Sequence, residues 1–284
     1  MPLGDRMARA AARGRMRPVR PLLAGLAALL LLGAAQGGGH RNMRVYLHGK
    51  PLSIRIYDPP PGAPKRPVQV LVVSGDLGWL AISADVPDRL QAEGYRVIGL
   101  NAQSYEVAFT GPHGAHLEPS QIPGDFDTIM EAASVDTTFP AAFVAIGVSE
   151  GSGLAVLAMG QPGASRLCAG VIALGLPVHT ALAWRWTDFP SWITKAEPNE
   201  PLADTEDYLA RLTVPLVVIH SIHDEYDAIE RVRAMVGTVP VPKRFFPVDA
   251  PNHRFSRRGR QVQALVDSSI VWLDSLRQAR GRGR

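Results

Sequence analysis

The stretch FVAIGVSEGSG, residues 143–153, decides the fold. Its first four residues are apolar, which predicts a strand buried on both faces. Residues 147–151 form the pattern G-x-S-x-G, and the run of small residues at 150–160 predicts a helix directly after it. A serine in this position sits on a tight strand-to-helix turn, for which the flanking glycines make room. The pattern therefore predicts that the hydroxyl of Ser149 is exposed at the end of a strand.

Strands and helices alternate on both sides of this stretch. Apolar, β-branched runs predict buried strands at 68–74, 95–101, 168–174, 215–220 and 244–248. The intervening segments predict a long loop at 102–120 and helices at 81–93, 122–138, 226–236 and 260–277. Two alternating runs, 45–48 and 52–57, predict an antiparallel hairpin. This order indicates a mostly parallel sheet with helices on both faces, which binds ligands at the carboxyl ends of its strands.

A serine hydroxyl is a poor nucleophile unless a base accepts its proton. His253 lies between the last predicted strand and the terminal helix, where such a base is expected. Asp224 comes early in the loop after the penultimate strand and is the favoured acid; Asp227 is the alternative, which would otherwise cap the next helix. The order serine, acid, histidine is that of the α/β-hydrolase fold. The sequence therefore predicts one α/β-hydrolase domain over 44–278, with catalytic Ser149.

A glycine-rich loop, SGDLGW at 74–79, follows the first buried strand. In hydrolases of this fold that loop supplies one amide to the oxyanion hole, and the residue after the nucleophile supplies the other. The predicted loop donor is the amide of Asp76 or Leu77, and the second donor is the amide of Glu150. Two more loop residues are predicted to contact substrate, Gly75 and Trp79. The alternative is an ordinary glycine-rich turn with Trp79 in the core.

This loop resembles the S-G-D-G-G-W motif of the VirJ/AcvB family of bacterial virulence proteins. The segment 94–99, an acidic helix start at Asp125 and the G-x-S-x-G pattern also agree, so the resemblance covers roughly residues 68–275. Two residues depart from the family pattern: Leu77 replaces its middle glycine and Glu150 replaces a bulky apolar residue.

The resemblance implies an exported α/β-hydrolase that cleaves lysyl-phosphatidylglycerol, a membrane lipid carrying an aminoacyl ester. Ser149 corresponds to the family's nucleophile, and Asp224 and His253 fit its acid and base. Acidic residues near the pocket would suit the cationic acyl group, and the candidates are Glu106, Glu150 and Asp188. The rival interpretations are an esterase or peptidase with a soluble substrate, and a non-catalytic accessory protein in secretion or virulence.

A small cap is predicted at 177–210, between two strands, where this fold often carries a lid. Its aromatic stretch, 183–192, contains Trp186, which is a candidate for contact with acyl chains or the membrane surface. An ordinary packed cap is the alternative.

The sequence of the amino-terminal segment predicts that the protein is exported. Residues 1–35 carry six arginines, then about 14 apolar residues, then Gly33-Ala34-Ala35, which is typical of a cleaved signal peptide or, alternatively, an uncleaved anchor. A linker is predicted at 36–43 and a basic tail at 279–284. In a bacterium, this predicts a periplasmic or secreted location.

The remaining composition narrows the class of function. Residues 1–35 hold 6 of the 30 basic and 1 of the 26 acidic residues. The rest of the chain therefore has 24 basic and 25 acidic residues, so the domain is nearly neutral and a nucleic-acid partner is not expected.

The single cysteine, Cys168, lies in an apolar run and is predicted to be a core residue. The spacing of His220, His223 and Asp224 does not favour a metal site. Neither a metal nor another cofactor is expected.

Overall fold

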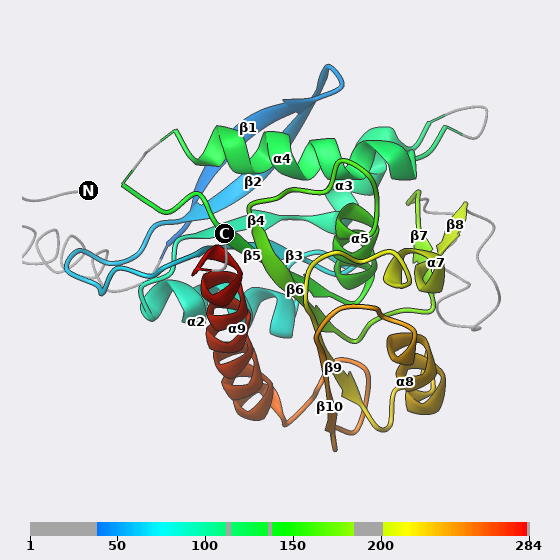
Figure 1. Cartoon of the computed structure of the whole chain (residues 1–284). Coiled ribbons are helices and arrows are strands. Elements are labelled where there is room, and N and C mark those ends of the chain that lie inside the picture. Colours follow the sequence, from blue (N-terminus) through cyan, green and yellow to red (C-terminus); the bar gives the residue numbers. More distant parts are fainter. Residues whose placement is uncertain (1–38, 112–114, 136–137, 185–200, 283–284) are drawn as a thin grey trace, which may run out of the picture. The chain divides into compact units, whose positions relative to one another are not determined.

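The computed structural model describes residues 39–111, 115–135, 138–184 and 201–282, within the compact unit Gly38–Arg284 (Figure 1). Its strands are β1 (Arg41–Leu47), β2 (Lys50–Tyr57), β3 (Gln69–Val73), β4 (Val97–Leu100), β5 (Phe143–Val148), β6 (Cys168–Leu174), β7 (His179–Ala181), β8 (Leu202–Asp204), β9 (Leu216–Ser221) and β10 (Lys243–Val248). Its α-helices are α2 (Ile82–Ala92), α3 (Ala102–Phe109), α4 (Ile122–Ala133), α5 (Glu150–Met159), α7 (Thr205–Leu209), α8 (Ile229–Gly237) and α9 (Gly259–Arg282).

Eight strands form one sheet in the order β1-β2-β4-β3-β5-β6-β9-β10, while β7 and β8 pair separately. β2 is antiparallel to both β1 and β4. From β4 to β10 in this order, each strand is parallel to the next. The predicted mostly parallel sheet with an amino-terminal hairpin is therefore confirmed.

The register of the parallel strands brings their carboxyl ends to one edge of the sheet. Val73 pairs with Gly147, and Gly147 pairs with Ala173. β9 and β10 also end level with each other, at Ser221 and Val248. This edge therefore gathers the segments that carry the predicted site, namely the loop 74–79, Ser149, Asp224 and His253.

Helices cover both faces of the large sheet (Figure 1). Buried side chains of α3, α4, α5 and α8 belong to the core on one face, and those of α2 and α9 to the core on the other. Each large aliphatic side chain buried in this way contributes about 1.5–3 kcal/mol. Cys168 is buried as predicted, and burial raises the pKa of its thiol to about 12, so the thiol stays protonated and inert.

The predicted long loop at 102–120 is wrong in its first half, because α3 occupies it. The side chain of Asn101 caps this helix by accepting a hydrogen bond from the amide of Ser104 at 3.0 Å. Ala102, Tyr105 and Phe109 are buried at helical spacing. The cap and this spacing stabilise a helix, and irregular backbone begins only after it.

The ends of the domain also differ from the prediction. β1 begins at Arg41, so 41–43 of the predicted linker (36–43) belong to a strand, because each of these residues pairs with a residue of β2. α9 continues to Arg282, so 279–282 of the predicted basic tail are helical. Arg280 fastens this last turn by donating a hydrogen bond to the carbonyl of Ala169 at 3.3 Å.

Some predictions fall outside the described residues: the export segment at 1–35, Trp186 and Asp188. Of the predicted cap at 177–210, the structure describes 177–184 and 201–210, which carry β7, β8 and α7. Within the described ranges, no helix combines the length and the apolar character needed to cross a membrane.

Candidate active site

Ser149 lies on the turn between β5 and α5. Its backbone adopts φ 50° and ψ −123°, a strained conformation of a kind that costs about 1–3 kcal/mol. A Cβ on Gly147 would lie 2.2 Å from the carbonyl oxygen of Gly151, and a Cβ on Gly151 would lie 2.2 Å from that of Ser74. The two glycines are therefore required by close approach of the backbone, as the G-x-S-x-G pattern predicts.

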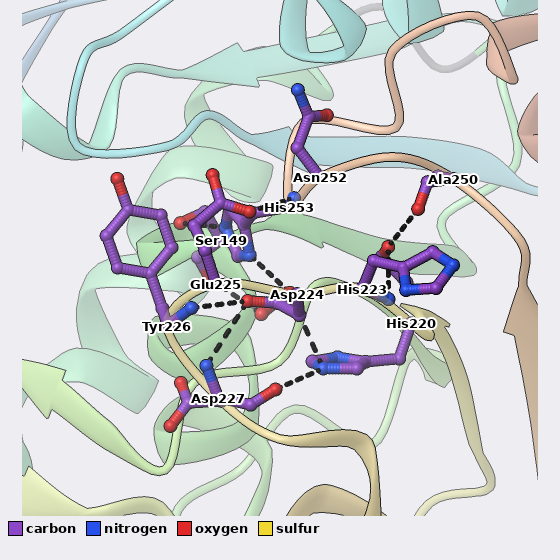
Figure 2. A network of polar contacts seen from close by, with 12 residues as sticks. Ser149, His220, His223, Asp224, Glu225, Tyr226, Asp227, Ala250, Asn252 and His253 are labelled. Atoms are coloured by element: carbon purple, nitrogen blue, oxygen red, sulfur yellow. Dashed lines mark hydrogen bonds and ion pairs between the residues drawn. The ribbon is translucent and has the colours of Figure 1, made fainter.

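A continuous chain of hydrogen bonds joins Ser149, His253 and Asp224 (Figure 2). The Oγ of Ser149 lies 2.9 Å from Nε2 of His253, and Nδ1 of His253 lies 2.6 Å from Oδ2 of Asp224. An ionised carboxylate only accepts hydrogen bonds, so Nδ1 carries the proton. In the neutral ring, Nε2 is then the acceptor for the serine hydroxyl. This arrangement allows the imidazole to remove the proton of Ser149.

The carboxylate of Asp224 is held by its own loop. It is fully buried, and its Oδ1 accepts hydrogen bonds from the amides of Tyr226 at 3.0 Å and Asp227 at 3.2 Å. The side chain of Asp227, the alternative acid, instead accepts a hydrogen bond from the amide of Val178 at 3.3 Å. The geometry therefore favours Asp224 as the partner of His253.

The loops that carry the acid and the base are fastened to each other. The hydroxyl of Ser221 donates to the carbonyl of Ala250 at 3.0 Å and accepts from the amide of His223 at 3.2 Å. The buried His220 contacts the carbonyl oxygen of Asp227 at 3.0 Å and Oδ2 of Asp224 at 3.4 Å. Figure 2 shows these side chains around the acid loop. They limit the movement of Asp224 relative to the base.

The two titrating groups shift each other's pKa values. Burial raises the pKa of Asp224, but the hydrogen bond and charge of His253 outweigh this and hold it below its usual value. Burial lowers the pKa of His253, but the hydrogen bond and charge of Asp224, with the charges of Glu225 and Asp76, raise it above its usual value. The pair therefore favours an ionised Asp224 beside a His253 whose pKa lies above its usual value.

Gly175, directly after β6, leaves the space that His253 occupies. It adopts φ +65°, and a Cβ built on it would lie 2.7 Å from Cε1 of the imidazole. We expect Gly175→Ala to displace His253 and to lower kcat for ester hydrolysis by about 100-fold, since small misplacements of reacting groups carry costs of that order. The measurement is steady-state kinetics on a chromogenic ester, together with a thermal melt.

Gly163→Ala is the matched control for this substitution. Gly163 also has a positive φ, +89°, but a Cβ there would meet nothing within 4 Å. It therefore shares the backbone strain without the contact to His253. If both variants kept the same activity as the wild type, the role assigned to Gly175 would be wrong.

The loop 74–79 lies against the nucleophile. A Cβ on Gly75 would be 3.5 Å from Cβ of Ser149, so this glycine lies beside the nucleophile. The amide of Leu77 donates to Oδ1 of Asp76 at 3.0 Å and is occupied by that bond. The carboxylate of Asp76 also interacts with its own backbone amide, so a substrate oxyanion would have to displace this carboxylate to reach either of the two predicted loop donors. The amide of Glu150 lies in the first turn of α5, where backbone N–H groups have no acceptor within the helix.

Three residues that were predicted to contact substrate are instead buried or make contacts within the protein. Trp79 packs on the sheet, where a Cβ on Gly99 would lie 2.8 Å from its ring and the guanidinium of Arg55 lies 4.8 Å from the ring centre. The carboxylate of Glu150 accepts a hydrogen bond from the amide of Ala181 at 2.7 Å. Glu106 is only 1% exposed, within α3. The contacts of Trp79 and Glu150 give these two side chains a structural role in the fold, and Glu106 is withdrawn from the surface.

Two residues at the site were not identified from the sequence. Tyr226 places its ring edge-on against His253, with 5.2 Å between the ring centres and an angle of 81° (Figure 2). Gly175 could have been found from the sequence, because it is a glycine immediately after a predicted buried strand, at the edge where the site forms.

In the part of the chain that the structure describes, no group of three or more His, Cys, Asp or Glu side chains is arranged to hold a metal ion.

The sequence matches the family model described as "Bacterial virulence protein (VirJ)" over residues 68–232, more than half of the chain. The chain belongs to the VirJ family. A search of curated proteins gives no match.

This VirJ-family chain is similar in structure to several hydrolases. Est1E from Butyrivibrio proteoclasticus, also solved with ferulic acid bound, superposes with a TM-score of 0.60 at 14% identity, over 82% of this chain and 99% of that one. The esterase domain of a Rhodothermus marinus protein gives 0.52 at 17% identity, over 80% and 97%. The acylaminoacyl peptidase of Pyrococcus horikoshii gives 0.56 at 14%, over 81% and 40%. At such identities the similarity establishes the fold, which is that of the α/β-hydrolases, as predicted.

Proposed function

We propose that this VirJ-family protein is a serine hydrolase that cleaves ester bonds, with Ser149 as nucleophile, His253 as general base and Asp224 as the acid that orients the base. The observation that carries the proposal is the chain of hydrogen bonds from the serine hydroxyl through the imidazole to a buried carboxylate, at 2.9 and 2.6 Å. The esterase-like fold and the membership in the VirJ family support the same class of reaction.

In the first half of the reaction, His253 accepts the proton of Ser149 while Oγ attacks the carbonyl carbon of the ester. The resulting oxyanion accepts hydrogen bonds from the amide of Glu150 and from the amide of Asp76 or Leu77. The bond to the leaving alcohol then breaks, and His253 protonates the departing oxygen. In the second half, water attacks the acyl-enzyme and gives a proton to His253, which then donates it to Oγ of Ser149 as the bond between Oγ and the acyl carbon breaks and the carboxylic acid leaves.

As substrate we propose an aminoacyl ester on a phospholipid headgroup, the lysyl-phosphatidylglycerol type that the family resemblance implies. Negative charge beside the reacting centre supports a cationic acyl group, because the charges of Glu225 and Asp76 add to the larger effect of Asp224 in raising the pKa of His253. The export segment predicted at 1–35 would place this reaction outside the inner membrane of a bacterium. The alternative is a soluble ester, which the binding of ferulic acid by Est1E favours.

Two experiments test the proposal in sequence. A fluorophosphonate probe reacts with an activated serine, so the purified protein should be labelled, and absence of labelling would favour a non-catalytic accessory protein. A substrate panel then compares lysyl-phosphatidylglycerol in mixed micelles with uncharged short-chain esters and with a feruloyl ester. A higher kcat/KM for the lysyl lipid supports the aminoacyl ester, and a preference for the feruloyl ester would contradict it.

The activity should depend on pH through His253. The base must be neutral to accept a proton, and its pKa is raised by Asp224, Glu225 and Asp76. We therefore expect kcat/KM to fall as the pH drops through an apparent pKa above 6.5. Glu225→Gln removes one of these charges and should move the midpoint to lower pH, whereas Glu230→Gln on α8 should leave it in place. A midpoint unaffected by Glu225→Gln would contradict this electrostatic account.

A further inference from the structure

The carboxylate of Asp76 occupies the amides that the substrate oxygen needs. Its Oδ1 accepts a hydrogen bond from the amide of Leu77 at 3.0 Å, and the carboxylate also interacts with the amide of Asp76 itself. These two amides are the predicted loop donors of the oxyanion hole. Because the oxygen that binds there becomes negative during the reaction, the carboxylate and the oxyanion compete for the same donors. The carboxylate therefore has to move before an ester can react.

The backbone of this loop is held in place, so the movement falls to the side chain. The amide of Gly78 donates to the carbonyl of Gly75 at 2.9 Å, which closes a tight turn around Asp76 and Leu77. The amide of Gly75 donates to Oγ of the buried Ser83, at the start of α2, at 3.3 Å. Rotation of the Asp76 side chain would uncover the two amides without disturbing these bonds.

Three carboxylates raise the pKa of His253, and they differ in what holds them. Asp224 lies 2.6 Å from the imidazole, and Glu225 accepts a hydrogen bond from the amide of His253 at 2.7 Å. The half-buried Asp76 is held by amides of its own turn. Burial raises the pKa of Asp76, and these amides and the charges of His253 and Arg254 offset this only in part. A cation beside this carboxylate would stabilise its ionised form.

An aminoacyl ester brings such a cation to the reacting carbonyl. Its α-ammonium is attached to the carbon next to the carbonyl, so it lies close to the oxygen that enters the loop. If the carboxylate of Asp76 exchanges the two amides for the α-ammonium, it stays paired in a charge-assisted contact. An uncharged ester offers no such exchange, and it leaves the displaced carboxylate without a partner in a half-buried position.

We propose that Asp76 is a specificity-determining residue of the proposed hydrolase, on which this inference rests: its carboxylate blocks the loop amides until the α-ammonium of an aminoacyl ester draws it away. The uncovered amides then bind the carbonyl oxygen, and the ion pair holds the acyl group while Ser149 attacks. Asp76 forms no covalent bond and transfers no proton in this step. It favours esters that carry a free α-amino group over esters of the same shape that lack one.

Alanine methyl ester and methyl isobutyrate test this role, because isobutyrate carries a methyl group in place of the α-ammonium. Release of methanol gives kcat/KM for each at about pH 7, where an α-amino group is mostly protonated. We expect Asp76→Asn, which keeps the shape of the side chain and an oxygen for the amide of Leu77, to lower the ratio of alanine ester to isobutyrate at least tenfold. Hydrolysis of methyl isobutyrate should not slow, which shows that the variant is folded. Comparing ratios between proteins cancels the intrinsic reactivity of the esters.

Glu225→Gln is the matched control for the charge. It removes another carboxylate that raises the pKa of His253, but it keeps an oxygen for the amide of His253 and leaves Asp76 in place. Its effect on the base is common to both esters, so their ratio should stay as in the wild type. Methyl 6-aminohexanoate is the control for the substrate, because its ammonium lies far from the carbonyl. Its hydrolysis should not slow in Asp76→Asn.

Three results would overturn the role of Asp76: an unchanged ratio in Asp76→Asn, an equal fall of the ratio in Glu225→Gln, or an equal loss for methyl 6-aminohexanoate and the alanine ester. In each of them the wild type still cleaves esters and Ser149 is still labelled by the fluorophosphonate probe, so the proposed hydrolase stands. A wild type that neither cleaves these esters nor reacts with the probe would contradict the proposed function, and this inference with it.

Discussion

Ser149→Ala will lower kcat for ester hydrolysis by roughly 10⁴- to 10⁶-fold, because no other group can form the acyl-enzyme. The Oγ that is removed is the atom 2.9 Å from Nε2 of His253. What rate remains would come from binding and from the oxyanion amides acting on water. Labelling by a fluorophosphonate probe should disappear in the same variant. The measurements are single-turnover kinetics on the best ester of the panel and gel fluorescence of the labelled protein.

Ser152→Ala is the control within the same turn. Ser152 is buried, and its hydroxyl donates a hydrogen bond to the carbonyl oxygen of Ser149 at 2.6 Å. Its loss costs the turn one hydrogen bond, about 1 kcal/mol, and leaves the nucleophile in place. We expect activity within about tenfold of the wild type. Equal losses in the two variants would mean that the turn, rather than the Ser149 hydroxyl, accounts for the activity.

Asp224→Asn will lower kcat by about 10⁴-fold, the size of loss that follows when the acid of such a triad becomes an amide. An asparagine can donate to Nδ1 of His253, which favours the wrong tautomer and leaves no acceptor toward the serine. The substitution also removes the main interaction that raises the pKa of His253, so the residual activity should titrate at lower pH. Steady-state kinetics across pH would show both effects.

Asp227→Asn separates the two candidate acids. Its carboxylate accepts a hydrogen bond from the amide of Val178, and its amide donates to Asp224. An asparagine retains the side-chain oxygen that accepts from Val178, so the acid loop should keep its shape. We expect less than a tenfold change in kcat. A larger loss in Asp227→Asn than in Asp224→Asn would reverse the assignment of the acid.

The sequence was most informative where function depends on local geometry. The turn at Ser149 was predictable because a short strand, closely spaced glycines and a helix of small residues all lie within a few positions. The places of Asp224 and His253 followed from the order of the strands, since the loops after parallel strands meet at one edge. That reasoning did not need the side-chain contacts, which the structure supplies.

The predictions were weakest where the answer depends on residues distant in the chain. Trp79 belongs to the right loop, but packing on Gly99 turns it onto the sheet. The side chain of Glu150 follows the nucleophile, yet Ala181 of β7 holds it. α3 was missed because the Gly, Pro and His residues after it dominated the pattern, although Asn101 caps it well. Such contacts depend on the register of separate elements, which no short window of sequence contains.

The order of the strands also has a consequence for how the protein matures. His253 is separated from Ser149 by 104 residues and follows β10, which pairs only with β9 at the border of the sheet. The nucleophile therefore has no base until the segment that follows β10 has docked beside Ser149. Bringing together residues so far apart in the chain requires closing a long loop, and folds rich in such long-range contacts fold more slowly. The proposed esterase would therefore be inactive until this segment has docked. The appearance of its activity would report that the carboxyl-terminal part of the domain has folded.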